Sequence, residues 1–173
     1  MKNCKNYAFI DGQNLYYNTV GMGWKIDVFR FRKYLTEKFQ VEKAFYFFGY
    51  REAENLKAYR MLRKAGFILV FREHYPKATS RKKGNVDTDI VFSVMEKLYH
   101  REKFDGVILV SGDGDYFRMV KLLRDEGRLE KIMFPTMRQQ SALYRRIEQR
   151  YKLYLDEAGV RKRIEFDAKK DRD

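Results

Sequence analysis

The sequence has little of the chemistry on which several common classes of protein depend. Cys4 is the one cysteine among 173 residues, so an internal disulfide framework is excluded and a reducing compartment, the cytoplasm, is expected. The two histidines, His74 and His100, are too few to build a histidine-rich zinc site. No apolar run reaches the roughly 20 residues that a membrane span needs, so we expect no membrane partner.

Positive charge and aromatic side chains, by contrast, are abundant. Lys and Arg outnumber Asp and Glu by 37 to 24, which gives a formal net charge of +13. The chain is 45% hydrophobic and 16% aromatic, so it can bury a core and is unlike a disordered chain. The excess of cations favours an anionic partner such as nucleic acid, although some basic proteins only use ion-pair networks for stability.

Short apolar runs alternate with helical patterns along the chain. Strands are predicted at residues 6–10, 43–48, 67–71, 106–110 and 131–134. Helices are predicted at residues 27–39, 52–65, 86–99 and 116–125, and from Ser141 onward. This alternation predicts an α/β fold with a central parallel sheet, and we expect the strand order 3-2-1-4-5. One domain is expected over residues 1–155, followed by a charged C-terminal tail over residues 156–173.

Acidic residues follow the first and the fourth predicted strands. Asp11 comes directly after the first strand, and Asp113 and Asp115 flank Gly114 after the fourth. If these strands are neighbours, strand order reverses between them, and Asp11 and Asp113 meet at the edge of the sheet where ligands bind. Acids gathered there repel one another unless a cation holds them, so we predict a divalent-metal site. Taken singly, each acid is also typical of a turn or a helix cap.

Two more acids lie in the first turn of the predicted helix 86–99. Asp87 precedes Val91 and Val94 at helical spacing, which predicts that it faces the sheet. Asp89 is roughly 200° further around the helix, so we expect it to face solvent or a basic neighbour. Asp87 would also suit the positive end of the helix dipole without any further role.

Carboxylates without histidine or cysteine suit magnesium or manganese rather than zinc. Such a site supports phosphodiester hydrolysis, because a metal lowers the pKa of a bound water and offsets charge on the phosphate. Asn14 could orient that water, bind the metal through its carbonyl oxygen, or bond only to the local backbone. The candidate catalytic residues are therefore Asp11, Asn14, Asp87, Asp113 and Asp115, with the four acids as metal ligands.

The substrate side needs cations and stacking surfaces near these acids. Basic side chains would offset the repulsion between the carboxylates and a phosphate backbone. A serine could donate to phosphate, and a tyrosine could stack on a base, although packing is the commoner role of an aromatic side chain. The candidate substrate-binding residues are Arg81, Lys82, Lys83, Ser111 and Tyr16.

Three segments resemble motifs of the NYN domain family, the LabA-like branch of the PIN-like nucleases. They are IDGQNL (10–15), KGNVDTDI (83–90) and LVSGDGDYFRMV (109–120). The resemblance implies a PIN-like three-layer α/β/α sandwich and a magnesium- or manganese-dependent ribonuclease. Carried over by position, it implies that the metal acids are Asp11, Asp87, Asp113 and Asp115, with Asn14 beside them.

The sequence departs from the family pattern at two places. A common K-G-V-D form is one residue longer here, which leaves open whether Asp87 or Asp89 takes the acidic position. A common G-D-S-D-F form has Gly114 and Tyr116 here, so a hydroxyl that could bind phosphate is lost at position 114. Neither departure removes an acid, so we expect activity to survive.

We therefore expect a cytoplasmic endoribonuclease that depends on Mg²⁺ or Mn²⁺ and acts on RNA, with a homodimer possible. The alternative is a non-catalytic PIN-like module that binds RNA or a protein and keeps the acids around a structural ion. A small-molecule phosphatase is a weaker alternative, because Gly12 and Gln13 follow Asp11 where such enzymes carry a D-x-D pattern.

Overall fold

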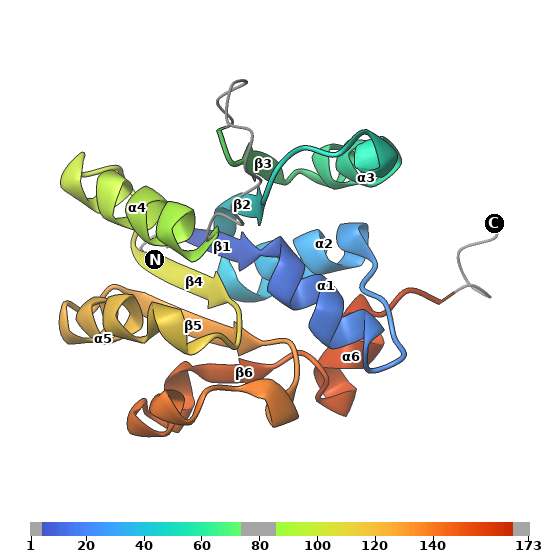
Figure 1. Cartoon of the computed structure of the whole chain (residues 1–173). Coiled ribbons are helices and arrows are strands. Elements are labelled where there is room, and N and C mark those ends of the chain that lie inside the picture. The colour runs from blue at the N-terminus through green and yellow to red at the C-terminus, as the bar shows by residue number, and fades with distance from the viewer. Residues whose placement is uncertain (1–4, 74–85, 168–173) are drawn as a thin grey trace.

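The computed structural model describes residues 5–73 and 86–167. Six strands form one parallel sheet in the order β3-β2-β1-β4-β5-β6 (Figure 1). Their bounds are β1 (Asn6–Asp11), β2 (Val41–Phe48), β3 (Ile68–Phe71), β4 (Gly106–Val110), β5 (Leu129–Phe134) and β6 (Lys152–Tyr154). The predicted α/β fold and the order of the first five strands are confirmed, and β6 extends the sheet at one edge.

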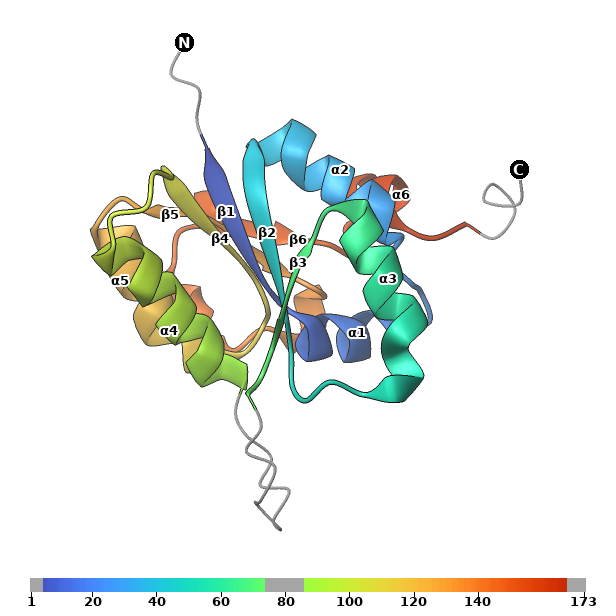
Figure 2. The same cartoon turned by 90° about the horizontal axis from the view of Figure 1, so that it is seen from above.

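Helices cover both faces of the sheet, which gives three layers (Figure 2). On one face lie α4 (Val86–Tyr99) and α5 (Phe117–Asp125), and on the other lie α1 (Gly12–Val20), α2 (Val28–Phe39), α3 (Leu56–Ala65) and α6 (Ala158–Ile164). Short 3-10 turns join these elements: η1 (Ala53–Asn55), η2 (Gly114–Tyr116), η3 (Met137–Gln139), η4 (Ala142–Arg146) and η5 (Gln149–Tyr151).

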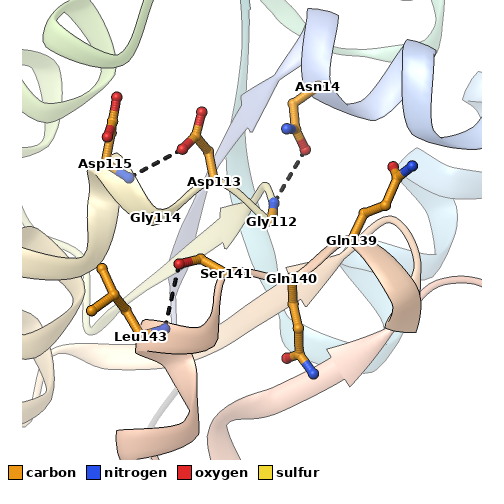
Figure 3. Close-up of a pocket in the computed structure, with 9 residues that line it drawn as sticks. All are labelled: Asn14, Gly112, Asp113, Gly114, Asp115, Gln139, Gln140, Ser141 and Leu143. Carbon is orange, nitrogen blue, oxygen red and sulfur yellow. Dashed lines mark hydrogen bonds between the residues drawn. The ribbon is translucent and has the colours of Figure 1, made fainter.

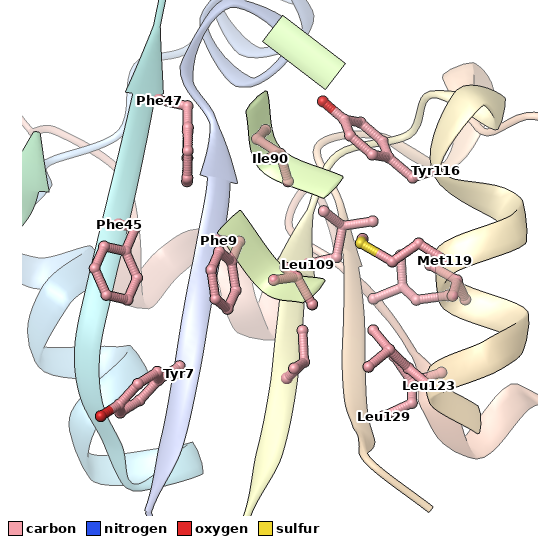
Figure 4. Packing of buried hydrophobic residues seen from close by; sticks show 14 of the residues in the cluster. Tyr7, Phe9, Phe45, Phe47, Ile90, Leu109, Tyr116, Met119, Leu123 and Leu129 are labelled. Carbon is pink, nitrogen blue, oxygen red and sulfur yellow. The ribbon is translucent and has the colours of Figure 1, made fainter. Parts of the chain in front are cut away.

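Two hydrophobic cores lie on the two faces of the sheet, because successive side chains of a strand point to opposite faces. In β1, Tyr7 and Phe9 belong to the core under α4 and α5 (Figure 4). Ala8 and Ile10 belong to the core under the other helices. Every residue of β1 is buried, so this strand forms a rigid base for the residues that follow it.

Local signals in the sequence set several helix ends as predicted. Asp27 caps α2, and its carboxylate accepts hydrogen bonds from Phe29 N and Arg30 N, each at 2.9 Å. Gly66 ends α3 with a φ of +96°, a left-handed conformation that favours glycine. The helix predicted over residues 52–65 begins with the η1 turn and becomes α-helical at Leu56.

The helix predicted from Ser141 onward is wrong. Ser141 does start a helical turn, and its Oγ accepts from Leu143 N, but this turn is the short η4. Tyr144 and Ile147 are buried three residues apart, a spacing that a 3-10 turn satisfies as well as an α-helix does. The chain then becomes extended and pairs with β5 as β6.

Part of the segment expected to be a charged tail is folded. Val160 and Ile164 on α6 are buried in the second core, and Arg161 on the same helix pairs at 2.7 Å with Glu165, which directly follows it. The sequence did not predict this helix, because its charged residues dominate the composition of the segment. Two apolar residues four positions apart are enough to bury one side of the helix. Residues 168–173 lie outside the described residues. Of the helices that the structure describes, none has both the length and the apolarity to cross a membrane.

Candidate metal centre

The candidate site lies at the carboxyl ends of β1 and β4, the two central neighbours in the sheet. Ile10 pairs with Val110, so the chain leaves both strands at the same level. It turns into α1 after β1 and into the η2 turn after β4. The connections diverge here, which is the topological switch point at which parallel α/β sheets bind ligands.

Three carboxylates meet at this edge, and each offers one oxygen. These oxygens, from Asp87, Asp113 and Asp115, all lie within 4.8 Å of one another. Asp87 comes from the first turn of α4, while Asp113 caps η2 by accepting a hydrogen bond from Asp115 N at 3.1 Å. Asp115 is exposed and the other two are half-buried, so the cluster is open to solvent. A set of oxygen donors at this spacing fits a hard divalent cation such as Mg²⁺ or Mn²⁺.

Asp11 lies beside this cluster but is not a member of it. Its side chain is only 5% exposed. Asn14 N donates to its Oδ1 at 3.0 Å, and the Tyr116 hydroxyl donates to its Oδ2 at 2.9 Å. Burial raises the pKa of Asp11 and the nearby charge of Asp113 raises it further, although both hydrogen bonds oppose the shift. Negative charge at Asp11 is therefore costly without a cation nearby.

The structure separates Asp87 from Asp89, which the sequence left unresolved. Asp89 Oδ2 lies 3.8 Å from Arg72 Nη1, and Asp89 is not part of the acidic cluster. Asp87 faces the sheet edge, as its spacing to the apolar residues of α4 predicted.

Asn14 is held in one orientation. Its Oδ1 accepts a hydrogen bond from Gly112 N at 3.1 Å, and its amide N–H groups have no acceptor among residues 5–73 and 86–167, so they can donate to a ligand. Figure 3 shows that the amide nitrogen is turned toward the side on which Asp113 lies. This arrangement favours donation to a ligand over coordination of a metal through the carbonyl oxygen.

An open cavity of about 600 Å³ adjoins the acids (Figure 3). One wall carries carboxylates, and the other carries neutral amide and hydroxyl groups. The lining residues are Asn14, Gly112, Asp113, Gly114, Asp115, Gln139, Gln140, Ser141 and Leu143. Sequence reasoning missed the glutamines, because no motif connects them to the acids.

The two glycines of the acidic loop let another segment approach closely. A Cβ at Gly112 would lie 2.6 Å from Gln139 O, and a Cβ at Gly114 would lie 2.5 Å from Ser141 Oγ. At Gly112 the close atom belongs to the main chain, so glycine is required there while the chain keeps this path; at Gly114 the close atom is a serine side-chain oxygen. Ser141 therefore places a hydroxyl directly against position 114, where the sequence lacks one.

The loop that carries Asp113 is held in place by hydrogen bonds from buried side chains and from the neighbouring segment. Ser111 is fully buried, and its Oγ accepts a hydrogen bond from Asp113 N at 3.2 Å, so it lies beneath the loop rather than at the surface. The buried Tyr144 hydroxyl donates to Asp113 O at 2.6 Å, and Ser141 N donates to Gly112 O at 3.0 Å. The roles of Tyr144 and Tyr116 had no signal in the sequence beyond their aromatic character.

The remaining substrate-binding candidates lie on the surface or outside the described residues. Tyr16 is 57% exposed and contacts only the edge of Tyr17 among described rings, with the ring centroids 5.7 Å apart. It is therefore available for stacking and is not part of the core. The three basic residues Arg81, Lys82 and Lys83 lie outside the described residues.

Comparisons with known proteins agree with this architecture. The sequence model of the NYN domain matches residues 6–152. Over 125 residues the chain is 27% identical to the low amplitude and bright protein LabA of Synechococcus elongatus; the match covers 67% of this chain and 66% of that protein's length. A crystal structure of a protein of unknown function from Vibrio parahaemolyticus superposes with a TM-score of 0.70 at 22% identity, covering 88% of this chain and 93% of that one. This last similarity concerns the fold alone.

Proposed function

The chain belongs to the NYN domain family of PIN-like nucleases, and we propose that it is a ribonuclease that hydrolyses RNA phosphodiester bonds with Mg²⁺ or Mn²⁺. The observation that carries this proposal is the group of three carboxylates within 4.8 Å at the carboxyl edge of the sheet. Asp113 and Asp115 line an open cavity, which supports a site that meets a substrate, because a structural ion needs no such opening.

We propose that Asp87, Asp113 and Asp115 hold the cation, and that Asp11 adds its charge from the buried side. When bound, the cation would lower the pKa of a water molecule and offset negative charge on the phosphate. The protein's own part is to keep these oxygens in place: Asp11 is held at both oxygens, and the main chain of Asp113 is held by hydrogen bonds on both sides of the loop.

The neutral wall of the cavity would bind the substrate. The amide of Asn14 is oriented as a donor, which suits a phosphate oxygen. Ser141 and the neighbouring glutamines offer further donors and acceptors for ribose hydroxyl groups or base edges. The exposed Tyr16 would stack on a base of single-stranded RNA.

Basic residues would balance the charge of the RNA backbone. The net charge of +13 favours a polyanion in general. Three exposed arginines lie within a few residues of the cavity-lining segment in the sequence: Arg138, Arg145 and Arg146. Within the described ranges, none of them has an acidic partner. The same role remains proposed for Arg81, Lys82 and Lys83.

The test measures the rate at which a fluorescently labelled single-stranded RNA is cleaved, and it compares variants of two neighbouring acids of α4. Wild type should cleave with Mn²⁺ or Mg²⁺ and stop with EDTA. Asp87→Asn should reduce the rate by about 100-fold or more, because it removes a ligand from the cluster. Asp89 pairs with Arg72 outside the cluster, so Asp89→Asn should retain the wild-type rate.

Two results would contradict the proposal. Full activity of Asp87→Asn would point to a contaminating host nuclease, because an unrelated enzyme does not respond to this substitution. RNA binding without products, unchanged by EDTA, would instead indicate a non-catalytic binding module.

A further inference from the structure

Tyr116 is a fully buried tyrosine at the end of η2, one residue after Asp115. Its ring belongs to the core under α4 and α5, together with Ile90 and Met119. Figure 4 shows the ring packed at the upper end of this core, with its hydroxyl pointing out of the core toward α4. A ring held this way has little freedom to move, so the position of its hydroxyl is fixed by packing.

The hydroxyl points at a carboxylate that is distant in the sequence. It donates to Asp11 Oδ2 at 2.9 Å in a buried hydrogen bond. Beside it, α4 packs against η2, the turn to which Tyr116 belongs.

We infer that Tyr116 is a positioning residue of the metal centre, whose hydroxyl fixes the Asp11 carboxylate beside the cluster. With Asn14 N on the other oxygen, Asp11 is held at both of its oxygens and cannot rotate freely. Residues that orient the charged groups around a metal in this way tune its affinity without touching it. The inference rests on the proposed function, because it assigns Tyr116 a role toward the cation of that site.

The test measures binding of Mn²⁺ itself, by the loss of the free-ion signal in electron paramagnetic resonance. Tyr116→Phe keeps the ring and removes only the hydroxyl, and it should weaken Mn²⁺ binding about tenfold. Tyr59→Phe is the matched control: its ring is also buried, and its hydroxyl accepts a hydrogen bond from Glu52 N at 3.3 Å on the opposite side of the sheet. This control should bind Mn²⁺ with the wild-type affinity.

A second comparison separates positioning from a general effect on the fold. In an Asp11→Asn background, adding Tyr116→Phe should change Mn²⁺ affinity by less than about twofold, because coupled residues do not act additively. The same tenfold loss in that background would overturn the assignment to Asp11. Equal Mn²⁺ affinity of Tyr116→Phe and wild type would overturn the inference altogether.

The RNA cleavage assay distinguishes this inference from the proposed function. If wild type binds Mn²⁺ and loses affinity with Tyr116→Phe but cleaves no RNA, the ribonuclease proposal fails while the positioning role stands. If wild type cleaves RNA and Tyr116→Phe binds Mn²⁺ normally, only the inference fails. Absence of Mn²⁺ binding in wild type would overturn both.

Discussion

Replacing Asp113 with Asn should stabilise the metal-free protein and abolish its stabilisation by a cation. The cluster places two carboxylates within 4.8 Å of that of Asp113. Like charges at this separation repel by about 1 kcal/mol in water-like surroundings, so the substitution should remove roughly 2 kcal/mol of repulsion. Asn keeps the local structure, because its oxygen can still accept from Asp115 N and the Tyr144 hydroxyl bonds the main chain.

The cation should reverse this order of stability. A cation at about 100 times its Kd adds roughly 2.7 kcal/mol to wild type, whereas the variant binds it weakly and gains little. Thermal unfolding followed by circular dichroism shows the reversal directly, since 1 kcal/mol corresponds to about 2–4 °C in a chain of this size. In EDTA the variant should melt above wild type, and in MnCl₂ it should melt below.

The control is Asp27→Asn, which changes the charge of another helix cap. Asp27 caps α2 by accepting from Phe29 N and Arg30 N, and it is not part of the acidic cluster. Its melting temperature should fall slightly and equally in EDTA and MnCl₂, because a neutral cap loses only the favourable interaction with the helix dipole. The reasoning is refuted if Asp113→Asn lowers the melting temperature by the same amount in both solutions.

Three further predictions address the cavity wall, the basic surface and the last helix. Gly114→Ser should slow RNA cleavage because its Cβ would lie 2.5 Å from Ser141 Oγ, and the added Ser141→Gly should restore the rate; no rescue would contradict this packing. Arg145→Glu should weaken RNA binding measured by fluorescence anisotropy and reduce the salt slope by about one, and an unchanged slope would remove Arg145 from the RNA surface. Ile164→Ala should cost about 2–4 kcal/mol in urea unfolding, because its side chain is buried, whereas the exposed Lys162→Ala should stay within about 0.5 kcal/mol.

The sheet was predictable because its strands are continuous apolar runs. Gly106–Val110 lacks polar alternation, as expected of a strand covered on both faces, and all five of its residues are buried. The segment 67–71 has the same apolar pattern, although β3 is an edge strand and is only partly buried. The end of the chain was harder to predict. Leu143 and Ile147 fit a helical spacing, but Leu143 is exposed in the 3-10 turn η4 and Ile147 follows that turn. The strand β6 depends on pairing with β5, a long-range contact.

The acids of the site were predictable from where they stand in the chain, since each follows a central strand or opens a helix beside one. The structure brings Asp87 together with the two acids after β4, and it shows Asp11 at the buried margin. The groups that hold these acids were not predictable. The hydroxyls of Tyr116 and Tyr144 reach the site across the fold, and such long-range contacts leave no periodic pattern in a sequence.

The most direct test of the metal centre is anomalous diffraction from a crystal soaked in MnCl₂. We predict a strong manganese peak among Asp87, Asp113 and Asp115, with carboxylate oxygens about 2.1 Å from it. The absence of any peak at this cluster under saturating Mn²⁺, with the fold intact, would contradict the proposed site.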